Sequence, residues 1–146
     1  MWRYRAPVKL SSDAQALALV PLFRSLSPDE LAFIARVSER LSLPAGDVII
    51  EQGQHGAEFV VLLSGAAVVT RDGESVATLG PGDFAGELAL LDPAPRTATV
   101  TITEAADVLL LGTREFWSVL SSSPGLDKKL LVALARRLRA AESHLA

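Results

Sequence analysis

The chain has 146 residues, of which 49% are hydrophobic and 21% are charged, so it can fold as one domain around a single core. It contains no cysteine and only two histidines, His55 and His144, which excludes disulfide frameworks, thiolate metal sites and a histidine cluster for a metal. We therefore expect no metal and no cofactor. No stretch approaches the roughly 20 apolar residues of a membrane span, so we expect no span. The absence of cysteine fits a reducing compartment, so we expect a cytoplasmic location.

Charge is distributed unevenly along the chain. Residues 41–107 hold ten carboxylates and only two cations, Arg71 and Arg96, a net charge of −8, whereas residues 125–146 carry +3. A nucleic-acid groove needs several phosphate-neutralising side chains along one surface, and the central segment cannot supply them. We expect no nucleic-acid partner, and any anion bound there must be small.

The amino-terminal part of the chain is predicted to be helical, with N-terminal helices over residues 1–44. Asp13 and Pro21 interrupt the early apolar run and no cleavage site follows it, which favours an amphipathic helix over a secretory signal. Ser27 then predicts a second helix start, because it can cap a helix whose first position is Pro28.

The middle of the chain, residues 45–112, is predicted to form a β roll. Short apolar runs rich in valine and isoleucine follow one another, each bounded by glycine, proline or an acid, and they predict strands over 48–50, 59–63, 66–70, 75–79, 97–103 and 108–111. Strands at this spacing are typical of an antiparallel sandwich or barrel. Asp72-Gly73 predicts a hairpin turn between two of them.

The helical period returns in residues 113–146. Phe116 and Trp117, on the first helix of this stretch, are predicted core residues. The long helix after residue 125 carries several apolar residues on one face, namely Leu130, Leu131, Leu134, Ala135 and Leu138. This stripe could pack on the domain or form the seam of a homodimer through the C-terminal helix.

The segment 82–98 does not have the pattern of a strand. Gly86 permits a close backbone approach, and the residues from Glu87 onwards predict one helical turn that Pro93 stops. Free amides at the start of such a turn can bind an anion without a metal, and Arg96 is placed to complete that site. A buried ion pair between Arg96 and Glu87 is an equally good interpretation of the residues alone.

This segment resembles the phosphate-binding cassette of the cyclic nucleotide-binding domain family. The matching residues are Gly86-Glu87-Leu88-Ala89-Leu90 and Arg96-Thr97-Ala98. Upstream glycines fall at the family's turn positions, namely Gly46, Gly53, Gly56 and Gly65. The resemblance covers about residues 20–140. It implies a mainly β fold, an antiparallel jelly roll (double-stranded β-helix) with N-terminal helices and C-terminal hinge and lid helices.

The resemblance also implies roles for the cassette residues. Arg96 would bind the cyclic phosphate, and Glu87 would accept a hydrogen bond from the ribose 2′-hydroxyl, which is the donor that a carboxylate beside a phosphate needs. Backbone amides near Gly86, Leu88, Ala89 and Ala98 would finish the cradle. Ala85 departs from the family, which more often has a large residue there.

The identity of the nucleotide stays open between cyclic AMP, which we prefer, and cyclic GMP. In some members similar to cyclic-GMP-selective kinases and channels, a threonine at the position of Thr97 contacts the guanine. A threonine is equally good at the start of a strand. Arg136, Arg137 and Arg139 are candidates to cap the purine from the last helix.

The function that the resemblance implies is a cyclic nucleotide sensor, not an enzyme, that relays binding through movement of its C-terminal helix to an unknown effector protein. The alternative is a non-catalytic protein-interaction module with a vestigial pocket. Regulators resembling the cyclic-AMP receptor add a helix-turn-helix after the lid, and we expect none here because the chain stops at Ala146.

Overall fold

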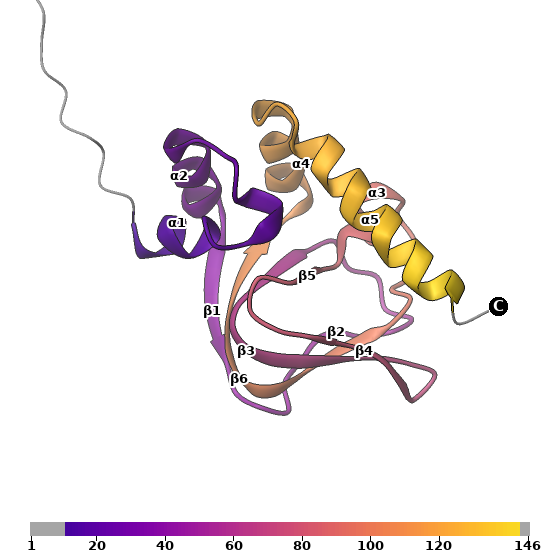
Figure 1. Cartoon of the computed structure of the whole chain (residues 1–146). Coiled ribbons are helices and arrows are strands. Elements are labelled where there is room, and N and C mark those ends of the chain that lie inside the picture. The colour runs from indigo at the N-terminus through magenta and orange to yellow at the C-terminus, as the bar shows by residue number, and fades with distance from the viewer. Residues whose placement is uncertain (1–10, 144–146) are drawn as a thin grey trace, which may run out of the picture.

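The computed structural model describes residues 11–143 and orders them as helices, a β roll and helices (Figure 1). The elements are α1 (Ser12–Leu17), η1 (Pro21–Phe23), α2 (Pro28–Val37), β1 (Glu39–Leu43), β2 (Val48–Ile50), β3 (Phe59–Arg71), β4 (Glu74–Leu79), β5 (Phe84–Ala85), α3 (Glu87–Leu91), β6 (Thr99–Leu111), α4 (Thr113–Ser122) and α5 (Leu126–Ser143). His144 and residues 1–10 lie outside the described residues, and so do the predictions made for them.

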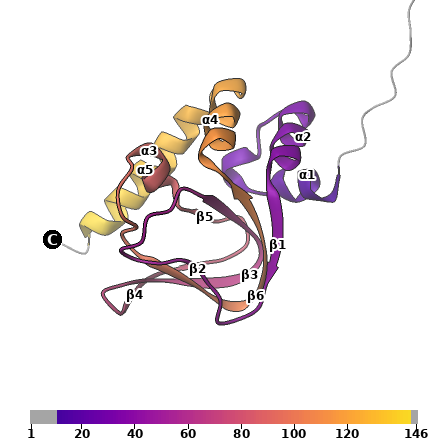
Figure 2. The same cartoon turned by 180° about the vertical axis from the view of Figure 1, so that it is seen from behind.

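The six strands form one antiparallel sheet in the order β1-β6-β3-β4, with β2 also on β6 and β5 also on β3. The sheet curls into a roll, and the helices lie at one end of it, α1 and α2 on one side and α3 and α5 on the other (Figures 1 and 2). This arrangement confirms the predicted antiparallel roll between helical ends.

Two long strands replace four of the predicted short ones. The predicted strands 59–63 and 66–70 are a single β3, and the last two predicted strands are a single β6. The register between β3 and β6 shifts near Gly65, so the chain bends there without leaving the sheet. Gly65 has φ +83°, and a Cβ atom on it would lie 2.4 Å from the Ala105 carbonyl oxygen. The missing side chain therefore lets β3 lie directly against β6.

The segment 39–43 is a strand, inside the stretch that the sequence analysis assigned to N-terminal helices. Helix α2 ends at Val37, and β1 pairs with β6. Arg40 on β1 forms ion pairs with Asp13 of α1 and with Asp107 of β6. The guanidinium of Arg40, with the Ser42 hydroxyl, holds the pKa of Asp107 below its ordinary value. These long-range partners, which local pattern does not reveal, stabilise the strand.

The predicted start of α2 is confirmed. The Ser27 hydroxyl accepts a hydrogen bond from the Glu30 amide at 3.2 Å, and the Glu30 carboxylate accepts one from the Ser27 amide at 3.0 Å, which is a complete capping box. The pKa of Glu30 lies below its ordinary value, mainly because of the hydrogen bond from the Ser27 amide and next because of the Ser27 side chain.

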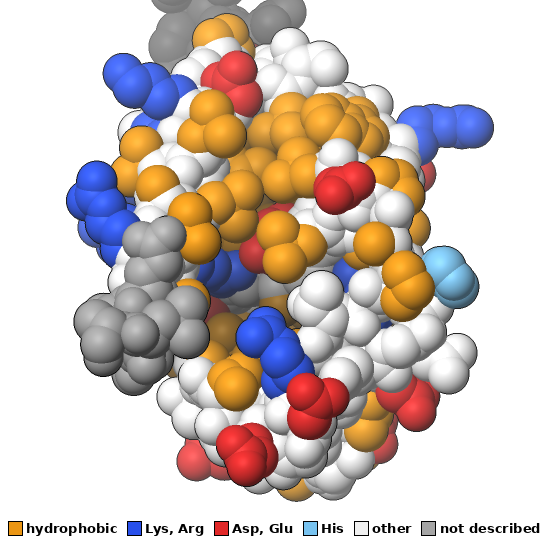
Figure 3. Space-filling model, turned by 90° about the vertical axis from the view of Figure 1, so that its right-hand side faces the viewer, with side chains coloured by type: hydrophobic (Ala, Val, Ile, Leu, Met, Phe, Trp, Pro, Cys, Tyr) orange, Lys and Arg blue, Asp and Glu red, His pale blue; other side chains and the backbone are white. Residues whose placement is uncertain are grey.

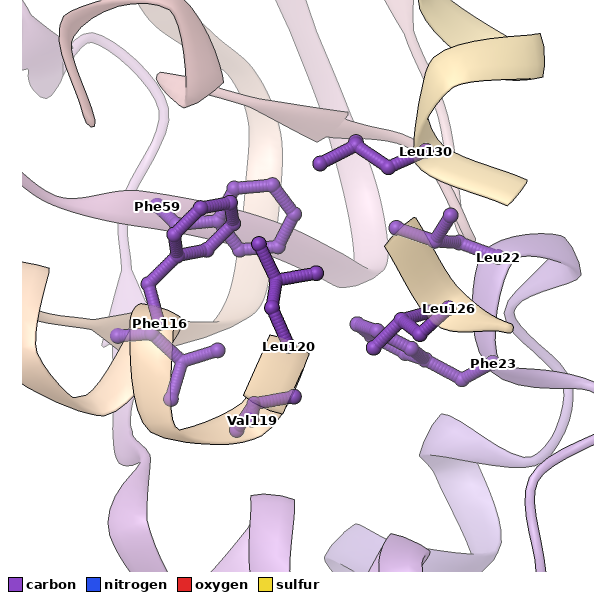
Figure 4. A pocket seen from close by; sticks show the side chains of 9 residues that line it. Leu22, Phe23, Phe59, Phe116, Val119, Leu120, Leu126 and Leu130 are labelled. Atoms are coloured by element: carbon purple, nitrogen blue, oxygen red, sulfur yellow. The ribbon is translucent and has the colours of Figure 1, made fainter. Parts of the chain in front are cut away.

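A small apolar pocket marks the place where η1, α4 and α5 meet over the end of the roll (Figure 4). Phe116 is buried there as predicted, with 4% of its surface exposed, whereas Trp117 points outward at 44% and was wrongly assigned to the core. The first turns of α5 contribute Leu126 and Leu130 to the pocket. The base of α5 is therefore held by apolar packing.

The apolar stripe predicted for the last helix divides into two. Leu130 is buried, but Leu131 and Leu138 are 66% and 61% exposed. Part of the stripe therefore faces solvent and does not pack on the domain. Within the described residues, no helix combines the length and apolar character needed to cross a bilayer.

Candidate functional site

The site is centred on the short loop between β5 and α3. Gly86 caps α3 with φ 92°, and a Cβ atom on it would lie 2.2 Å from the Glu58 carbonyl oxygen. No side chain fits there, because β3 begins directly behind the loop. The cassette backbone is thus pressed against the edge of the roll.

Arg96 lies behind this loop with only 7% of its surface exposed. Its guanidinium donates from Nη1 to the Gly86 carbonyl at 3.1 Å and from Nη2 to the Glu58 carbonyl at 3.2 Å. It also forms an ion pair of 3.3 Å with the Glu58 carboxylate, whose side chain is 57% exposed. The Arg96 backbone exchanges hydrogen bonds with Gly53 and Gln54. Hydrogen bonds therefore hold both the backbone and the guanidinium of Arg96 in place.

Glu87, the first residue of α3, is 5% exposed. Its Oε1 accepts a hydrogen bond from Arg137 Nη1 on α5 at 2.7 Å. Arg137 also donates to the Phe84 carbonyl at 2.5 Å, and its Cζ lies 4.0 Å from the centre of the Phe84 ring. The structure therefore brings Glu87 and Arg96 into one neighbourhood but gives them different partners, so the ion pair between these two residues is not formed.

The remaining predicted site residues directly follow Glu87 and Arg96 in the sequence. Leu88 is 53% exposed and Ala89 8% exposed, and amides in the first turn of a helix have no acceptor within it. Thr97 is exposed and precedes β6, which begins only at Thr99. Ala98 lies next to it and is half-buried. The predicted strand start at Thr97 is therefore two residues too early.

The side of the molecule that carries α3 and the end of α5 is hollowed (Figure 3). Hydrophobic side chains gather around the hollow, and both basic and acidic side chains are visible within it. A buried cation and a buried carboxylate next to the same Gly86 loop suit a ligand that carries an anionic group and a hydroxyl donor.

Part of this site was not predicted from the sequence. Arg137 was one of three candidates on the last helix, and its position seven residues after the buried Leu130 could have selected it. Gly56 was noted only as a turn residue, whereas a Cβ atom there would lie 3.0 Å from Arg96 Nε. Glu58 and Phe84 were not considered, because nothing local in their sequence indicates their contacts.

Residues 40–123 match the model of the cyclic nucleotide-binding domain. The chain belongs to this family. It is 41% identical over 110 residues to a cAMP-dependent protein kinase regulatory subunit from Hypocrea atroviridis, covering 75% of this chain and 24% of that protein. It is 29% identical over 137 residues to a CRP-like cAMP-activated global transcriptional regulator from Mycobacterium tuberculosis, covering 90% of this chain and 61% of that protein.

A solved structure described as Sp-2Cl-cAMPS bound to PKAR CBD2 superposes with a TM-score of 0.79. It is 29% identical and the alignment covers 90% of this chain and 88% of that chain. The alignment therefore covers most of both chains in this comparison. In contrast, the present chain spans only 24% and 61% of the two regulatory proteins.

Proposed function

We propose that this domain is a cyclic nucleotide sensor without catalytic activity, with cyclic AMP as its ligand and with no cofactor. The observation that carries this proposal is that a buried arginine, Arg96, and a buried carboxylate, Glu87, lie next to the same Gly86 loop with different partners. The names of the two relatives, a cAMP-dependent kinase subunit and a cAMP-activated regulator, support the choice of ligand.

Each polar group of the cassette has one task in this proposal. Arg96 binds the cyclic phosphate, because a guanidinium can donate two parallel hydrogen bonds to phosphate oxygens. Glu87 accepts the ribose 2′-hydroxyl. The amides of Gly86, Leu88, Ala89 and Ala98 complete the cradle. Thr97, whose side chain is exposed, is available to a guanine, so cyclic GMP is the second ligand to test.

The signal leaves the domain through α5. A ligand shifts the equilibrium between two positions of this helix only by the difference in its affinity for them. Helix α5 contacts the cassette through Arg137, and the residues of the apolar pocket hold its first turns on the domain (Figure 4). The position of α5 can therefore change with the occupancy of the nucleotide site. The receiver is an effector protein. The acidic central segment disfavours nucleic acid as that receiver, and the lack of cysteine suits the cytoplasm.

Titration calorimetry with cyclic AMP and cyclic GMP tests the ligand directly. Binding should also raise the melting temperature, because a ligand at 100 times its dissociation constant stabilises the folded state by about 2.7 kcal/mol. Absence of binding and of any melting shift with millimolar nucleotide would refute the proposal and favour an interaction module with a vestigial pocket.

We also propose a homodimer through α5. Leu131 and Leu138 are exposed and stand seven residues apart, with the half-buried Leu134 between them, which is the spacing of a two-helix seam. Sedimentation equilibrium should show a dimer for the wild type and a monomer for a variant with Leu131→Lys and Leu138→Lys. A monomeric wild type at high micromolar concentration would contradict this proposal.

A further inference from the structure

Arg137 makes the most specific contact between α5 and the cassette. One guanidinium donates to a buried carboxylate, donates to the Phe84 carbonyl and lies over the Phe84 ring. Arg136 and Arg139 on the same helix are exposed, and among the described residues neither makes a hydrogen bond or ion pair with the cassette. The contact therefore belongs to one position of the helix and not to its general positive charge.

Glu87 depends on this contact. A carboxylate removed from water is costly unless it has a counter-ion or hydrogen-bond donors, and the side chain of Glu87 is 7% exposed. Among the residues that the structure describes, Arg137 is the partner that forms an ion pair with it. Without Arg137, the carboxylate would lose its counter-ion and would turn towards water.

The two oxygens of Glu87 are used differently. Arg137 binds Oε1, and in the described part of the chain no group donates a hydrogen bond to Oε2. An ionised carboxylate offers only acceptors, so Oε2 remains available to a donor from outside. In the proposed function this donor is the ribose 2′-hydroxyl.

We propose that Arg137 is a positioning residue that holds the Glu87 carboxylate in the orientation that accepts the ribose 2′-hydroxyl, and that it thereby links the position of α5 to recognition of the ribose. This inference rests on the proposed function of the pocket. It assigns to the lid helix the preference for a ribonucleotide over its 2′-deoxy analogue, although α5 itself need not touch the sugar.

The first test compares cyclic AMP with 2′-deoxy cyclic AMP by calorimetry. A hydrogen bond to an ionised group should give the wild type a preference of roughly 10-fold or more for cyclic AMP. Arg137→Met, which keeps a long unbranched side chain without the guanidinium, should reduce this preference to less than about threefold, mainly by weakening the binding of cyclic AMP. Lys128→Ala, at an exposed position of the same helix, should keep the full preference.

Equal weakening of both nucleotides in Arg137→Met would overturn the proposal, because it would mean that Arg137 only stabilises the lid. An unchanged preference would overturn it as well. Arg137→Lys supplies a second folded variant, which keeps the charge but loses the planar fork, and it should show an intermediate preference.

Hydrogen exchange of the ligand-free protein tests the link without any nucleotide. Glu87→Gln and Arg137→Met should each speed exchange of the α5 amides, and the double variant should add little to either, since both remove the same contact. Additive effects, or none, would overturn the link. Failure of the wild type to bind either nucleotide would instead overturn the proposed function and the ribose recognition with it, while this exchange result would still decide the contact.

Discussion

Replacing Arg96 with alanine should lower the affinity for cyclic AMP by about 10- to 100-fold. The variant loses charge-assisted hydrogen bonds worth about 1.5–3 kcal/mol. The phosphate must displace or share the Glu58 carboxylate at 3.3 Å from Nη2. Because the Glu58 side chain is 57% exposed, it can turn to water at little cost, and the phosphate oxygens can replace it as acceptors for the buried guanidinium.

Two further variants separate loss of binding from loss of folding. Arg96→Ala also removes the hydrogen bonds to the Gly86 and Glu58 carbonyls, so circular dichroism must first show that it is folded at the titration temperature. Arg96→Lys keeps the charge without the fork and should bind with intermediate affinity. Arg36→Ala removes an equal charge from α2, on the opposite side of the roll from α3 (Figure 1), and should bind like the wild type. Full affinity in a folded Arg96→Ala would contradict the assignment.

Local sequence rules predicted most elements because the patterns that determine them are local. The capping box at Ser27, the hairpin between β3 and β4, and the single turn after Gly86 all arise from residues within four positions of each other. The cassette residues come from two nearby stretches and were recognised together by their resemblance to the family. The resemblance therefore predicted that Arg96 and Glu87 gather, and the structure added how each of them is held.

What the sequence did not predict depends on contacts between distant segments. Residues 39–43 became a strand through pairing with β6 and through the ion pair of Arg40 with Asp107, 67 positions away. Glu87 found its counter-ion 50 positions later, on α5. A helical pattern shows which face of α5 is apolar, but not how much of that face the roll can cover, so Leu131 and Leu138 were assigned to one stripe with Leu130.

Replacing Gly65 with alanine should destabilise the domain far more than the same change at Gly73. Both glycines have nearly the same left-handed backbone, with φ +83° and +82°, so each variant should lose about 1–2 kcal/mol from that conformation alone. Only at Gly65 would the new methyl group collide with β6, at 2.4 Å from the Ala105 oxygen and 2.7 Å from the Ala106 Cα, whereas nothing lies within 4 Å at Gly73. Forcing apart two packed strands should cost roughly a further 1–3 kcal/mol.

Urea unfolding followed by circular dichroism measures the difference in the free energy of unfolding between the two variants, in which the shared backbone contribution cancels. Equal losses would mean that β3 and β6 can separate freely at the bend, and that the bare backbone of Gly65 does not hold the two long strands together.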